Sequence, residues 1–170
     1  MMVEQLETIS ESLIKSHMHA RNHLLNILSD VNLEQWETVH KNSLWSIQST
    51  CAEILNYEVE TLNKTFPGAL TKVADNFSLQ EFRIIQNEIS EFLSLKLREE
   101  NLQAGFTYTA TDDGPPTVHW IMVRTIQHSI YHSGGISVLR HFVGLPRAEY
   151  AAWEQMVDSV FLAGFGNLEL

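Results

Sequence analysis

Residues 117–146, TVHWIMVRTIQHSIYHSGGISVLRHFVGLP, decide the fold, because they carry an apolar run at helical spacing that stops at Gly144-Leu145-Pro146. A glycine near the C-terminal cap with a proline just beyond it typically ends a helix. We therefore predict one long helix here. At ~100° per residue, one narrow stripe of this helix is expected to face the protein interior. Its members are Ile121, His128, His132, Gly135, Leu139 and Phe142.

Two histidines give this helix its chemical interest. His128 and His132 are four residues apart, so their imidazoles stand on one helical face about one turn apart, which is the spacing of metal ligands. The chain has eight histidines, so such pairs also arise by chance, and hydrogen-bonded core histidines are the alternative. The adjacent Gly134 and Gly135 predict that another helix or a ligand passes close by, since glycine inside a helix is otherwise unfavourable.

Composition restricts the class of protein. A length of 170 residues suits a single domain spanning 1–170. The net charge of −10, from 21 acidic and 11 basic residues, argues against nucleic acid or an anionic membrane as the main partner. No signal peptide and no apolar run of membrane length are found, so we expect a cytoplasmic protein. The single cysteine, Cys51, lies in an apolar segment and is expected to be a buried, inert thiol.

The remaining patterns are also helical. Apolar periodicity predicts helices over about residues 3–28, 46–64, 78–99 and, shorter, 147–161. Ser78 and Glu81 form a capping box signature, and residues 101–116 are expected to be extended or a loop. Leu33 and Trp36 are expected to pin the polar connection between the first two helices. These elements indicate an all-α helical bundle.

Three polar residues fall on or beside predicted apolar faces. His17 lies on the inward stripe of the first helix, either as a hydrogen-bonded core residue or near a central polar site. Glu58 lies near the centre of the next helix's apolar face and needs a partner, by bonding to another helix or by snorkelling at the helix end. Glu53 lies on the border of that face, where the simplest role is a surface charge.

Residues 124–146, RTIQHSIYHSGGISVLRHFVGLP, resemble the signature of the DinB/YfiT-like family. The shared features are two histidines four apart, a Gly-Gln-Ile-like triplet, an arginine and a Gly-Leu-Pro stop. The segment LWSIQSTCAEIL, residues 44–55, is similar to that family's Trp-Ser-Ile opening of its second helix. The resemblance covers nearly the whole chain in element order. It implies an up-down-down-up four-helix bundle with an additional short C-terminal helix, often dimeric, and a divalent metal held by three side chains, two of them equivalent to His128 and His132.

The chain departs from the family at the third ligand. That ligand is usually a histidine seven residues after the motif serine, here Ser46, and position 53 is Glu53. A two-His-one-carboxylate set suits Fe, Ni, Mn or Zn, and the metal identity stays open. Glu58 is the next candidate ligand, and a degenerate site without metal is the alternative. Gly135 replaces a common glutamine and removes a possible supporting amide.

The family resemblance implies a metal-dependent enzyme that activates water or a low-molecular-weight thiol and acts on a small-molecule substrate, as a hydrolase or thiol-dependent transferase. His17, Tyr57, Glu58 and Arg124 are the candidates to line the pocket. Arg124 lies one turn before His128, where it either holds an anionic substrate group or pairs with a glutamate, the second being favoured. The competing hypothesis is a metal-free helical binding module, a homodimer formed through aromatics near Trp153 and Phe161.

Overall fold

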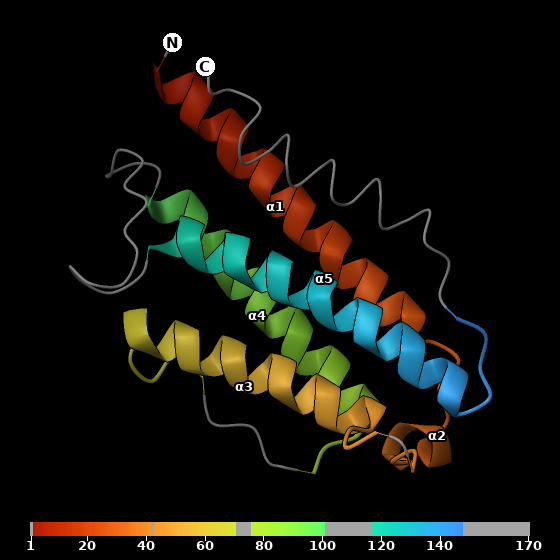
Figure 1. Ribbon diagram of the computed structural model, residues 1–170. Coiled ribbons are helices and arrows are strands. Elements are labelled where there is room, and N and C mark those ends of the chain that lie inside the picture. The colour runs from red at the N-terminus through yellow and green to blue at the C-terminus, as the bar shows by residue number, and fades with distance from the viewer. Residues whose placement is uncertain (1, 42, 71–75, 101–116, 148–170) are drawn as a thin grey trace.

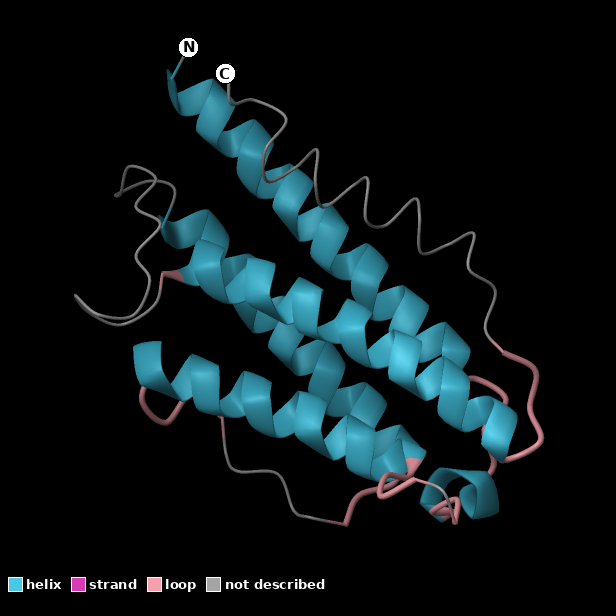
Figure 2. Cartoon of the chain, viewed as in Figure 1, coloured by secondary structure: helices cyan, strands magenta, loops and turns pink. Residues whose placement is uncertain are grey.

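The computed structural model describes residues 2–41, 43–70, 76–100 and 117–147. Every regular element in these residues is an α-helix, so the predicted all-α class is confirmed (Figures 1 and 2). The helices are α1 (Met2–Ile27), α2 (Leu33–Glu37), α3 (Ile47–Thr65), α4 (Leu79–Glu100) and α5 (Val118–Phe142). The helix predicted after residue 147 and the extended segment predicted before residue 117 lie outside the described residues.

Contacts at one end of the bundle fix the helix directions. The Trp36 indole Nε1 in α2 donates to the carbonyl of Phe77 at 3.2 Å, and the Gln48 side chain near the start of α3 donates to the same carbonyl at 3.2 Å. Gln35 of α2 donates to the carbonyl of Val143, just after α5, at 3.4 Å. Helices α1 and α5 therefore run towards this end and α3 and α4 run away from it (Figure 1). Helices α1 and α3 each pack on α5 and α4.

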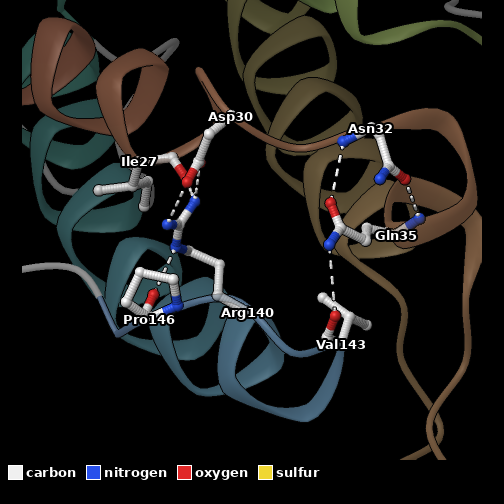
Figure 3. Close-up of polar contacts among 7 residues, drawn as sticks. All are labelled: Ile27, Asp30, Asn32, Gln35, Arg140, Val143 and Pro146. Carbon is white, nitrogen blue, oxygen red and sulfur yellow. Dashed lines mark hydrogen bonds and ion pairs between the residues drawn. The ribbon is translucent and has the colours of Figure 1, made fainter.

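Arg140 ties the end of α5 to the turn that follows α1 (Figure 3). Its guanidinium donates to the Ile27 carbonyl, to both carboxylate oxygens of Asp30 and to the Pro146 carbonyl, the last at 3.1 Å. The hydrogen bond from Arg140 holds the pKa of the Asp30 carboxyl below its usual value. Arg140 thus donates to the Ile27 carbonyl, which the end of α1 leaves without a helical partner, and the Asp30 carboxylate accepts from the same guanidinium.

Local capping groups set the helix ends close to their predicted positions. Ser46 and Ser49 cap α3 reciprocally, and Ser78 and Glu81 form the predicted capping box before α4. Gly144 follows α5 with a φ of +82°, in the left-handed region that favours glycine. These ends depend on hydrogen bonds within a few residues.

The short helix α2 was not predicted. Asn32 and Gln35 form a capping box at its start, within the stretch that we expected to be an irregular connection. Trp36 is buried as expected, but Leu33 is 68% exposed, so its predicted anchoring role is wrong. The buried anchor of this helix is the Trp36 ring, which contacts Phe77 and Phe82.

The buried face of α5 differs from the predicted one. It includes Ser129 and Ser133, whereas Gly135 is exposed and Phe142 is 40% exposed. The hydroxyl of Ser133 donates to the Ser129 carbonyl at 2.7 Å, so this small polar side chain can be buried without loss of a hydrogen bond. Because apolar residues occur all around α5, their spacing did not identify the face that packs.

The expected close approach at the glycine pair is also wrong. A Cβ atom added at Gly134 or at Gly135 would meet nothing within 4 Å. Cys51 lies in the core as predicted, and burial raises the pKa of its thiol well above the usual range. Among the helices in the described ranges, none combines membrane length with the apolar composition that a bilayer requires.

Candidate metal centre

Glu53 on α3 and His128 and His132 on α5 converge on one point. Their potential ligand atoms all lie within 4.8 Å of one another. The two imidazole Nε2 atoms are 3.1 Å apart, and Nε2 of His128 is 3.3 Å from Oε1 of Glu53. The other carboxylate oxygen of Glu53 lies against Nε2 of His132. Ligand atoms bound ~2.1 Å from a shared ion are about 3.0–3.4 Å apart, so this donor set fits a divalent metal.

The centre lies at the border of the α3–α5 interface rather than deep in the core. The side chains of His128, His132 and Glu53 are 16%, 12% and 40% exposed. Glu53 thus lies on the border of the apolar face of α3, as predicted. The histidines are shifted from the buried face of α5, so they reach α3 while remaining accessible from solvent. The three side chains are therefore partly exposed to solvent.

Burial keeps both imidazoles in the form that binds metal. It lowers the pKa of His128, as do the nearby His132 and Arg124, while Glu53 opposes the shift. Burial likewise lowers the pKa of His132 against the opposing effect of Glu53. A pKa below the usual histidine value leaves the imidazole neutral at pH 7, and only the neutral ring offers a lone pair to a metal.

Two tyrosines flank the histidine pair. The Tyr57 ring centroid is 4.2 Å from that of His128, with 31° between the planes. Tyr131 meets His132 edge to face at 5.0 Å, and Tyr131 is 75% exposed. Tyr57 therefore lies beside the centre, as predicted. Tyr131 was missed because, on an exposed part of α5, it belongs to no apolar pattern.

Arg124 does not make the expected pair with a glutamate within the described residues. Its Nη1 donates to the side-chain oxygen of Gln127 at 2.9 Å. Its guanidinium carbon lies 5.8 Å from the ring of Trp120. The arginine that precedes the candidate metal centre by one turn is therefore held by neutral neighbours.

Glu58 lies in the core and is engaged by two other helices. It accepts a hydrogen bond from Gln86 of α4 at 2.8 Å and pairs with Arg21 of α1 at 2.8 Å. The Arg21 contact is an ion pair by distance, although its N–H groups are not aligned for a hydrogen bond. Burial raises the pKa of Glu58, and Arg21 and Gln86 oppose that shift. The predicted bond to another helix is correct, and Glu58 does not join the metal-ligand group, which contains Glu53.

His17 is buried at 1% exposure, but neither ring nitrogen has a hydrogen-bond partner within the described residues. The hydrogen-bonded core histidine predicted for this position is therefore wrong. Burial, and then the charge of Arg21 one turn later on α1, hold the pKa of His17 well below its usual value. The structure thus places His17 beside the interior ion pair and not among the converging ligand atoms.

Comparison with protein-family models, with curated proteins and with solved structures gave no match to this chain. The likeness to the DinB/YfiT-like family accordingly rests on the motif residues in α3 and α5.

Proposed function

We propose that this chain is a metal-dependent enzyme of the DinB/YfiT-like class, in which Glu53, His128 and His132 hold one divalent ion. The observation that carries the proposal is the convergence of two Nε2 atoms and a carboxylate at ligand separations. Two imidazoles and one carboxylate suit Ni, Zn, Mn or Fe. The candidate substrate is a small molecule, because the ligand atoms lie at a partly exposed interface between two helices.

Three protein ligands leave coordination positions open for a small nucleophile. A divalent ion supplies one kind of chemistry there, since it lowers the pKa of a coordinated water or low-molecular-weight thiol towards neutrality. The proposed reaction is therefore hydrolysis or thiol-dependent group transfer. The protein residues orient the site: the Tyr57 ring restrains the plane of the His128 imidazole, and Glu53 supplies the negative charge that favours a cation.

Metal analysis tests the proposal directly. The purified protein, incubated with Ni, Zn, Mn or Fe(II) and then dialysed, is expected to retain about one ion per chain. His128→Ala and Glu53→Ala should lose it, whereas His141→Ala, an exposed histidine on the same helix, should keep it. At a free metal concentration about 100 times the Kd, stability should rise by about 2.7 kcal/mol, or roughly 5–10 °C in Tm.

One observation favours a second candidate function. The carboxylate of Glu53 contacts both imidazoles directly, so it can partner them without an ion. The chain would then be a metal-free helical binding module that forms a homodimer. Failure of the unmutated protein to retain any of the four metals would refute the enzyme proposal and select this one. Light scattering after size exclusion would then measure whether a dimer forms.

A further inference from the structure

Arg124 is held beside the candidate metal centre with one edge of its guanidinium free. It precedes His128 by four residues on α5, so the two side chains emerge about one helical turn, ~6 Å, apart. Gln127 binds Nη1, and the Trp120 ring lies 5.8 Å from the guanidinium carbon. Within the described residues, Nε and Nη2 of Arg124 make no hydrogen bond. These two groups form the edge that binds a carboxylate with two parallel hydrogen bonds.

Within the described residues Arg124 has no carboxylate partner, although the chain has a net charge of −10. Of the ten described lysines and arginines, five pair with carboxylates, and Arg124 is one of the five that do not. The charge of Arg124 lies close to the candidate centre, because Arg124 precedes His128 by one turn of α5. The positive charge of Arg124 opposes the binding of a metal cation nearby. It attracts an anionic ligand that contacts both Arg124 and the metal.

We infer that the centre takes a substrate or cosubstrate that carries a carboxylate or similar oxyanion, which binds the Nε–Nη2 edge of Arg124. This inference rests on the proposed function, since it adds a class of ligand to the same site. Arg124 is a specificity residue for that ligand and does not hold the metal.

Two thiols of equal length and different charge test the inference. The metal-loaded protein is titrated calorimetrically with 3-mercaptopropionate and with 3-mercaptopropionamide, and the metal content of the same sample is measured first. The carboxylate should bind about tenfold more tightly than the amide. Arg124→Gln should reduce this ratio to about one while leaving the affinity for the metal undiminished. Arg98→Gln, which removes an exposed arginine on α4, is the charge-matched control and should keep the ratio.

The outcomes separate the two proposals. Equal binding of the two thiols at one metal per chain overturns the anion site and leaves the metal centre standing. A carboxylate preference that survives in Arg124→Gln also overturns it, because the anion would then bind elsewhere. Failure to load metal overturns both proposals. Loss of the preference in Arg124→Gln but not in Arg98→Gln supports the anion site.

Discussion

Removing one partner of the interior ion pair should destabilise the protein strongly. Arg21 is 4% exposed and Glu58 is fully buried, so Arg21→Met leaves a buried carboxylate whose remaining partner is the Gln86 amide. Breaking a buried pair in this way typically costs 3–5 kcal/mol. Protonation of Glu58 sets an upper limit on this loss of unfolding free energy, because the variant can neutralise the carboxyl instead of burying its charge. Protonating a carboxyl costs ~1.4 kcal/mol for each pH unit above its usual pKa, or about 3–4 kcal/mol at pH 7.

Glu58→Gln provides the rescue. It removes the charge but still accepts a hydrogen bond from Gln86, so Arg21→Met/Glu58→Gln should recover at least about 2 kcal/mol relative to Arg21→Met alone. Urea unfolding followed by circular dichroism, with EDTA present to exclude metal, measures these free energies. For a slope of about 2 kcal/mol/M, Arg21→Met should lower the midpoint by roughly 1.5–2 M.

An ion pair on the surface supplies the control for the Arg21→Met and Glu58→Gln variants. Lys64 and Glu60 are 3.1 Å apart, but their side chains are 61% and 72% exposed. Lys64→Met should therefore change the free energy of unfolding by less than about 0.5 kcal/mol. A loss below about 1 kcal/mol for Arg21→Met, or the absence of rescue by Glu58→Gln, would refute the buried ion pair.

Two further changes test other parts of the structure. His17→Phe should stabilise the protein relative to wild type as the pH falls: the lowered pKa of His17 means that the unfolded chain binds a proton first, so wild type loses stability below the usual histidine pKa. Between pH 7 and pH 5.5, the free energy of unfolding of His17→Phe relative to wild type should rise by about 1.3 kcal/mol. The same pH dependence for both proteins in urea titrations would contradict this. Asp30→Asn should lower the free energy of unfolding by roughly 1 kcal/mol at pH 7. The loss is small because Asp30 is half exposed and because Arg140 keeps its two carbonyl acceptors. Because the pKa of Asp30 is lowered, this contribution is present above its usual pKa and fades as the pH falls through the folded value, so the loss of stability in Asp30→Asn should disappear once the pH lies below that lowered pKa.

The sequence by itself determined the four long helices α1, α3, α4 and α5 and most of their ends. The caps at Ser46, Ser78 and Gly144 depend on hydrogen bonds or backbone angles within a few residues, so a local pattern is enough to place them. The spacing of His128 and His132 is local in the same sense, because four residues along a helix always bring two side chains to one face.

Only the tertiary structure decided which face of α5 is buried and which polar groups meet. The buried face carries Ser129 and Ser133, whose small side chains give no hydrophobic signal in the sequence. The partners of Glu58 and the meeting of Glu53 with the two histidines join segments that are far apart in the chain. Such contacts follow from the packing of whole helices, which depends on many small interactions between residues far apart in the sequence. The local spacing of residues therefore does not predict them.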